Sequence, residues 1–256
     1  MSPMIRCAMC ALLFTLGCAE DPPEDADDAE TSADIIGGTR TTAYPAVMAL
    51  FAGDLQSGAG SLCTASLIAP RVLITAAHCV SAEEVGPAAD FIVFTGADFN
   101  QGSGRTLAVS AVMHDPAFST AHLNAGHDIG AVILASPLST PPVAVNRAVD
   151  PTKLLGQAVR LVGYGASNGA QQTGAGIKRT TTTTLKGADA RLLKLGDSQH
   201  GTCQGDSGGP AFMSIGGIQT LVGVTSFGQA GCADGGFDTR IDRYGSFIDA
   251  ALQRGR

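Results

Sequence analysis

The sequence lacks both a surplus of basic residues and a long apolar segment. Its 256 residues carry 16 Lys and Arg against 23 Asp and Glu, which gives a formal net charge of −7. Eight of the acids fall within residues 19–34, and 15 acids against 15 bases remain once residues 1–34 are set aside. The rest of the chain therefore has no net positive charge that would attract nucleic acid, and its sequence shows no basic face for anionic lipid.

Residues 1–18 are typical of an export signal, because Arg6 precedes an apolar run that is too short to span a membrane. The run ends in Thr15-Leu16-Gly17-Cys18, which resembles a bacterial lipoprotein cleavage site, although Thr15 stands where Leu is usual. We therefore expect a lipid on Cys18 as the only membrane attachment. The alternative is an ordinary secretory signal that is cleaved near Ala19. Residues 19–34 are expected to be a disordered acidic tether or propeptide, because their like charges repel.

The seven cysteines divide at the same boundary. Cys7 and Cys10 belong to the signal, Cys18 would carry the lipid, and the remaining four are Cys63, Cys79, Cys203 and Cys232. An even number of cysteines in an exported chain predicts two disulfides, and spacing alone leaves three pairings open. A metal site is the competing interpretation, but these four cysteines form no CxxC pair and no paired histidine ligands accompany them. We expect no metal and no cofactor.

A sustained helical period is missing until the last stretch of the chain. From residue 35 onward, short apolar or alternating runs are separated by Gly, Pro, Asn and Asp, a pattern typical of antiparallel β barrels or sandwiches. The five consecutive threonines at 180–184 fit a strand. A C-terminal helix is expected at residues 244–252, where apolar side chains recur on one face.

One stretch, GTCQGDSGGPAF at residues 201–212, places a serine among four glycines, an acid and a cysteine. Glycines allow a tight turn in which backbone N–H groups remain open to a substrate carbonyl. The N–H groups of Gly205 and Ser207 would then form an oxyanion hole, and Ser207 would be the nucleophile. The alternative is a glycine-rich surface turn.

A nucleophilic serine needs a base and a group that orients the base. His78 lies in LITAAHCV, at the end of an apolar run among small residues, and Asp128 stands at the head of the apolar run DIGAVIL. A carboxylate drawn inside with such a run needs a hydrogen-bond partner, and the Nδ1–H of His78 would satisfy it. Without that support, His78 would be interpreted as a core residue.

At this point the chain resembles the chymotrypsin/trypsin-like serine endopeptidases, from residue 35 to about residue 248. The segments that carry the resemblance are IIGG at 35–38, TAAHC at 75–79, DIGAVIL at 128–134, GYG at 163–165, GTCQGDSGGP at 201–210 and TSFG at 225–228. The order His78, Asp128, Ser207 also matches this family.

The resemblance implies an all-β fold of two six-stranded antiparallel Greek-key barrels, at residues 35–140 and 141–242, with a C-terminal helix and tail at 243–256. His78 and Asp128 would lie on the first barrel and Ser207 on the second, with the active site in the cleft between them. The resemblance also selects the disulfides Cys63–Cys79 and Cys203–Cys232.

The resemblance further implies a zymogen. A cut between Asp34 and Ile35 would create an ammonium at Ile35 that folds inward and pairs with Asp206. Because Asp34 is not basic, the activating protease would need a preference for acidic residues. Such a protease is an expected partner.

The primary specificity pocket departs from the trypsin-like pattern. Gly201 stands where trypsin-like members have an aspartate, and the walls would fall at Gly228 and Gly236, so the pocket is expected to be neutral. Ser226, Phe227 and Gly228 would bind extended substrate as a strand edge. His200 and Asp238 are polar neighbours of this pocket, and the family's third common disulfide is missing.

Two classes of function follow. The first is an exported, monomeric serine endopeptidase that acts on proteins or peptides, with esterase activity alone as a weaker variant. The second is a catalytically silent relative that serves as a binding or adhesion lipoprotein, because a fold does not fix a function.

Overall fold

The computed structural model describes residues 35–102 and 104–256. The segments expected to be an export signal and an acidic tether, together with Cys18 and Asp34, lie outside the described residues. Within those residues, no helix is both long and apolar enough to cross a membrane.

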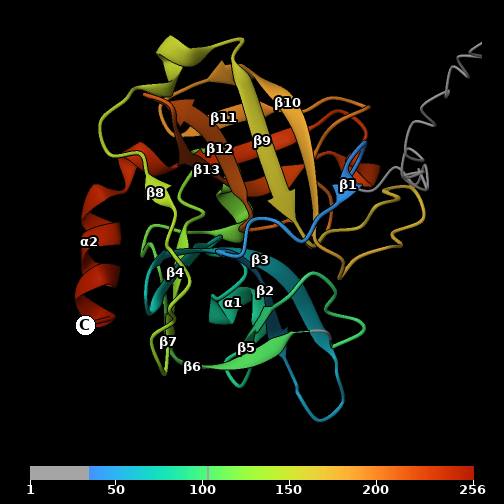
Figure 1. Cartoon of the computed structure of the whole chain (residues 1–256), viewed down its shortest axis with the longest axis vertical. Helices are drawn as coiled ribbons and strands as arrows, with labels where there is room; N and C mark the ends of the chain where they lie inside the picture. Colours follow the sequence, from blue (N-terminus) through green and yellow to red (C-terminus); the bar gives the residue numbers. More distant parts are fainter. Residues whose placement is uncertain (1–34, 103) are drawn as a thin grey trace, which may run out of the picture. The chain divides into compact units, whose positions relative to one another are not determined.

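The first barrel is a closed ring of six antiparallel strands in the order β2-β3-β4-β7-β6-β5 (Figure 1). Its interior is filled by aliphatic side chains, because strands such as VMALFAG and GAVIL are buried along nearly their whole length. The strands are β2 (Val47–Gly53), β3 (Gly60–Ala69), β4 (Val72–Thr75), β5 (Asp90–Thr95), β6 (Arg105–His114) and β7 (Gly130–Leu134).

The second barrel closes in the order β9-β10-β11-β14-β13-β12, and β12 returns to β9. Two short strands extend its sheet, because β1 pairs with β10 and β8 runs parallel to β13. The prediction of two six-stranded barrels is confirmed. The strands are β9 (Ala158–Gly163), β10 (Arg179–Ala188), β11 (Leu192–Leu195), β12 (Pro210–Ile215), β13 (Ile218–Gly228) and β14 (Gly236–Arg240), with β1 (Thr39–Arg40) and β8 (Ala144–Val145).

The threonine run lies on β10, where burial alternates residue by residue. Thr181 and Thr183 face inward, whereas Thr182 and Thr184 face solvent. A period of two is the signature of a strand with one covered face, and β-branched residues suit that geometry.

The C-terminal helix α2 (Gly245–Arg254) forms as predicted. It buries Ile248 and Ala251 in the same hydrophobic cluster as the interior residues of the first barrel. Other helical segments are short turns between strands. They are α1 (Ala82–Val85), η1 (Thr120–Ala125), η2 (Pro151–Leu154), η3 (Ala230–Cys232) and η4 (Ile241–Arg243).

The first described residues join the second barrel, although they precede the first barrel in sequence. Ile36 forms an isolated antiparallel bridge with Gly201, and the Thr181 hydroxyl donates to the carbonyl oxygen of Gly37. Residues 36 and 37 are therefore held against the second barrel, Ile36 beside the segment that leads into the Ser207 loop.

Candidate active site

His78 and Asp128 meet because their parent strands are neighbours. β4 ends at Thr75 and β7 begins at Gly130, and these two residues pair directly. The segments that carry His78 and Asp128 therefore leave the barrel at the same edge. The imidazole Nδ1 lies 2.8 Å from Asp128 Oδ2, and the backbone N–H of His78 donates to Oδ1 at 2.9 Å.

A third donor to Asp128 comes from the second barrel. The Ser226 hydroxyl donates to Asp128 Oδ2 at 2.5 Å. Asp128 has an exposed fraction of 0%, so these donors replace the water that a buried carboxylate would otherwise need. The network fixes the orientation of the imidazole and leaves Nε2 as the nitrogen that is free for chemistry.

The electrostatics suit a base. Burial lowers the pKa of His78, but the hydrogen bond and charge of Asp128 outweigh it and hold the pKa above its usual 6.5. Burial raises the pKa of Asp128, but the hydrogen bonds from His78 and Ser226 and the His78 charge lower it overall. These shifts favour an ionised Asp128 carboxylate, beside which His78 is a neutral imidazole once the pH exceeds its raised pKa.

The loop around Ser207 is tightly constrained by glycine. Gly208 has φ +80°, and a Cβ there would lie 2.0 Å from Thr75 Oγ1 and 2.4 Å from the Thr64 carbonyl oxygen. No other residue fits this close approach to the first barrel. The N–H of Gly208 in turn donates to the Thr225 carbonyl oxygen at 2.8 Å.

Thr64 on β3 holds this loop against the first barrel. Its N–H donates to the Ser207 carbonyl oxygen at 2.8 Å, and its hydroxyl donates to the Gly205 carbonyl oxygen at 2.9 Å. The same hydroxyl accepts from the N–H of Tyr164 at 3.1 Å. One buried threonine therefore positions two segments of the second barrel, the Ser207 loop and the backbone at Tyr164.

The two N–H groups expected in an oxyanion hole are open. Within the described residues, neither Gly205 nor Ser207 donates its N–H to a protein atom. Gly205 reaches this arrangement with φ +98°, which a side chain would strain. Two unpaired donors beside a nucleophile are what a developing oxyanion requires.

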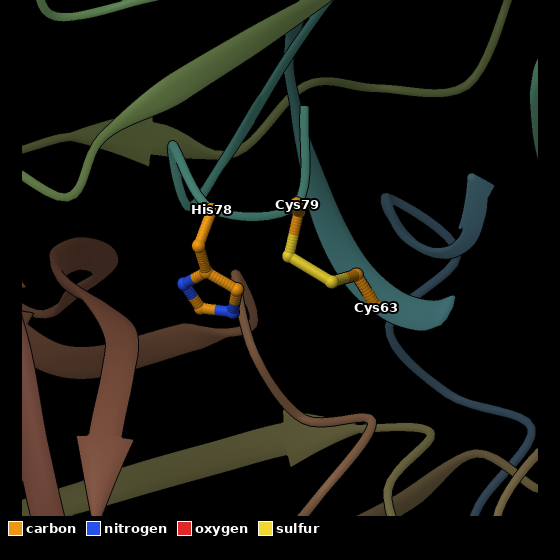
Figure 2. A group of neighbouring side chains, drawn as sticks. All are labelled: Cys63, His78 and Cys79. Atoms are coloured by element: carbon orange, nitrogen blue, oxygen red, sulfur yellow. A yellow bond between two sulfur atoms is a disulfide. The ribbon is translucent and has the colours of Figure 1, made fainter. Parts of the chain in front are cut away.

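Both disulfides expected from the resemblance are formed, Cys63–Cys79 and Cys203–Cys232. Figure 2 shows the first of them beside the His78 ring. A sulfur atom of each cysteine and a ring nitrogen of His78 lie within 4.8 Å of one another, but the sulfurs are bonded to each other and offer no thiolates to a metal. Cys79 Sγ also lies 3.7 Å from the Ser207 carbonyl oxygen, so the base and nucleophile loops are adjacent.

A cavity of about 140 Å³ opens beside Ser207. Ser226, Phe227 and Gly228 lie on its wall, as the sequence suggested, together with residues 202–204 and Thr225. Gly201 and Gly236 are not part of that wall. Gly201 instead bridges Ile36, and a Cβ at Gly236 would lie 3.5 Å from the Thr202 hydroxyl oxygen, directly behind the wall. His200 is exposed and lies 3.7 Å from Asp197.

Ile35 and Asp206 are both enclosed, with exposed fractions of 0% and 1%. The Asp206 carboxylate accepts from the N–H of Gly165 at 2.8 Å and from that of Cys203 at 2.9 Å. Burial nevertheless raises the pKa of Asp206 to about 6, although these two donors and the Arg179 charge lower it. Gly163 and Gly165 are required here, since a Cβ at either would lie within 2.4 Å of this carboxyl group.

Two β barrels that bring a histidine–aspartate pair beside a serine in a glycine-rich loop define the class of double-barrel serine peptidases. Comparison with known proteins agrees. The family model described as trypsin matches residues 35–248, and the chain belongs to this family.

Relatives align over most of the chain. A protein named trypsin from Saccharopolyspora erythraea is 29% identical over 243 residues, which cover 86% of this chain and 97% of the relative. Chymotrypsin-like elastase family member 1 of Bos taurus is 27% identical over 88% of this chain and 92% of its own length. Human kallikrein-11 is 29% identical over 75% of this chain and 72% of its own length.

Some residues of the site carry no signal that sequence reasoning could have used. Thr64 is an ordinary threonine in a strand. Ser226 was expected only as part of a substrate-binding edge, and its bond to Asp128 joins residues that are 98 positions apart.

The role of Thr64 predicts the effect of Thr64→Val, which keeps the side-chain shape but removes the hydroxyl. The Gly205 carbonyl and the Tyr164 N–H would both be left buried and unpaired, which costs about 1–3 kcal/mol each. We expect the free energy of unfolding to fall by about 2–6 kcal/mol. The kcat/KM for peptide hydrolysis should fall on the order of 10²-fold, as expected when a reacting group is displaced by about 1 Å. Denaturant titration and kcat/KM of the chain starting at Ile35 measure both.

Ser66→Ala is the matched control. Ser66 lies two residues further along β3, is equally buried, and its hydroxyl has no hydrogen-bond partner in the described residues. It should leave kcat/KM unchanged. If the two variants behave alike, Thr64 does not position the loop.

The pKa of His78 predicts the acid limb of the pH profile. The base acts only when neutral, so with an uncharged peptide substrate kcat/KM should fall as pH drops through a value above 6.5. In Asp128→Asn the carboxylate support is gone while burial remains, so the limb should move below 6.5. The kcat should also fall on the order of 10⁴-fold, the loss that the same Asp-to-Asn change causes in the Ser-His-Asp triad of a serine protease. An unmoved limb would show that Asp128 does not set the pKa of His78.

Proposed function

We propose that the protein is an exported serine endopeptidase that hydrolyses peptide bonds through Ser207, His78 and Asp128. The observation that carries this proposal is the network in which Ser226 and two nitrogens of His78 converge on one buried carboxylate, next to the loop of Ser207. Two disulfides in the described domain support an oxidising, extracytoplasmic location.

In the first half of the reaction, Ser207 Oγ attacks the scissile carbonyl carbon while His78 Nε2 takes the hydroxyl proton. The carbonyl oxygen becomes anionic and is held by the N–H groups of Gly205 and Ser207. His78 then gives the proton to the leaving amine, and the C–N bond breaks to leave an acyl-enzyme. In the second half, water gives a proton to His78 while its oxygen attacks the ester carbon. His78 then returns the proton to Ser207 Oγ as the acyl C–O bond breaks, and the carboxylic acid product leaves.

Substrate would bind in an extended form along β13. Phe227 and Gly228 pair with β14 on one side, and Ser226 lies at the register shift that precedes them, whereas β12 pairs with β13 only as far as Val224. The other backbone edge is therefore open to a substrate strand. The residues on the wall of the adjacent cavity carry no charged side chain, so side chains without a charge should be favoured before the scissile bond.

The test of this proposal is Ser207→Ala. Wild type starting at Ile35 should react covalently with a fluorophosphonate and turn over a peptide ester with a burst, because the acyl-enzyme accumulates. Ser207→Ala should do neither, while Ser214→Ala, a change at a serine on the far part of β12, should retain both. Mass spectrometry of the labelled peptide decides it. A label elsewhere, or a wild type that binds peptides without turnover, would overturn the proposal and favour the catalytically silent alternative.

We infer in addition that the exported chain is a zymogen. In the uncut chain the nitrogen of Ile35 is an uncharged amide, and burial raises the pKa of Asp206 to about 6 in spite of two backbone donors and the Arg179 charge. A cut before Ile35 would create an ammonium within an already enclosed residue. Its pairing with Asp206 would offset the cost of burying that charge and fix the backbone of Gly205.

This inference predicts a large difference between the chain from Ala19 and the chain from Ile35. The longer chain should show little turnover of a peptide substrate, and Asp206→Asn in the shorter chain should lose roughly 10²- to 10³-fold in kcat/KM, because breaking a buried pair costs about 3–5 kcal/mol. Asp197→Asn, at an exposed acid on the preceding loop, is the control.

Mass spectrometry of the naturally exported protein should find Ile35 as its first residue. Equal activity of the two chains, with Asp206→Asn harmless in both, would refute the switch.

A further inference from the structure

A second buried acid, Asp238 on β14, takes no part in the mechanism described above. Its exposed fraction is 1%, and its Oδ2 has no hydrogen-bond partner among the described residues. Burial raises the pKa of this carboxyl to about 8, the Thr225 hydroxyl works against the rise, and the nearby Asp206 adds to it. The group is therefore a neutral carboxylic acid near pH 7, which both donates and accepts hydrogen bonds.

Asp238 lies one strand behind the cavity beside Ser207. On β13 and β14, Thr225 and Asp238 are direct antiparallel partners, so their side chains share one face of the sheet. Thr225 is on the wall of the cavity, and two backbone hydrogen bonds, to Gly208 and Gly209, hold it against the serine loop. The carboxyl therefore backs the part of the wall that Thr225 forms.

The Thr225 hydroxyl is unsatisfied as well. Thr225 has an exposed fraction of 5%, and its Oγ1 makes no hydrogen bond of good geometry in the described part of the chain. In the part of the chain that the structure describes, the strand neighbours of Asp238 bring no side-chain donor to Oδ2: Leu193 pairs with it on β11, and a Cβ at Gly223 would lie 3.2 Å from Oδ2. Apart from their weak contact with each other, the two adjacent buried groups lack partners among the described residues, and an unmade buried hydrogen bond ordinarily costs about 1–3 kcal/mol.

We propose that Thr225, backed by Asp238, makes one part of the cavity wall polar, and that the two residues select substrates whose side chain before the scissile bond ends in an uncharged hydrogen-bonding group, with tyrosine preferred over phenylalanine. This inference rests on the proposed endopeptidase function and adds two specificity-determining residues to it. A phenol hydroxyl donates and accepts, so it satisfies the wall when it enters, whereas a phenyl ring leaves both groups unpaired. Sites of this kind reject the analogue that lacks the hydroxyl more strongly than apolar pockets discriminate by size.

The first test uses the wild-type chain from Ile35 and peptides that differ only in the residue before the scissile bond. We expect kcat/KM for Tyr to exceed that for Phe by at least tenfold, and 4-aminophenylalanine to resemble Tyr. No variant is needed, so a folding defect cannot obscure the result.

The second test assigns the preference to the two residues. Thr225→Val and Asp238→Leu should each bring the Tyr to Phe ratio close to 1, and Asp238→Asn, which keeps donor and acceptor atoms, should preserve most of it. Thr239→Val is the matched control, because Thr239 is the next residue of β14, equally buried and with an unpartnered hydroxyl, but faces the other side of the sheet. Its ratio should equal that of wild type.

Failures of the inference and of the proposed function give different results. A wild type that cleaves after Tyr and Phe equally well, or one that prefers Lys or Arg, overturns the polar wall while leaving the endopeptidase in place. So does a Tyr preference that survives both Thr225→Val and Asp238→Leu. A wild type that hydrolyses none of the peptides and takes no fluorophosphonate label overturns the proposed function itself.

Discussion

The proposed catalytic residues come from two barrels, and their relative placement depends on two adjacent residues of β3. Cys63 is bonded to Cys79, which follows His78 directly, so it fixes the loop of the base. Thr64 binds the carbonyl groups of Gly205 and Ser207, so it fixes the loop of the nucleophile. Because neighbouring residues of one strand cannot move independently, the distance between the two loops is set by a single rigid element.

Three buried aspartates near this junction differ mainly in the donors that reach them. Asp128 accepts from His78 twice and from Ser226, and its pKa is lowered. Asp206 accepts from two backbone N–H groups, and its pKa is about 6. Asp238 has an oxygen with no partner among the described residues, and its pKa is about 8. All three are buried, so the hydrogen-bond donors and neighbouring charges decide how far burial raises each pKa.

The parts of this structure that the sequence predicts are those where chemistry restricts the residue type. Ser207 stands out because glycines surround it, and the strands follow from short alternating runs. Thr64 and the Thr225–Asp238 pair do not stand out, because threonine and aspartate are common and their partners are set by strand register. The bond from Thr64 to Gly205 joins residues 141 positions apart, a separation over which local patterns carry no information.

Strand register also brings the first described residues into contact with the wall of the cavity beside Ser207. The N–H of Gly201 donates to the Ile36 carbonyl oxygen, and Ile36 packs against Cys203 and Cys232, which are part of the cavity wall. Gly201 is therefore a backbone partner of Ile36, and its lack of a side chain leaves room for that contact. Under the proposed activation, pairing of Ile35 with Asp206 would also place Ile36 against this wall, so the same two residues would order the Ser207 loop and the cavity.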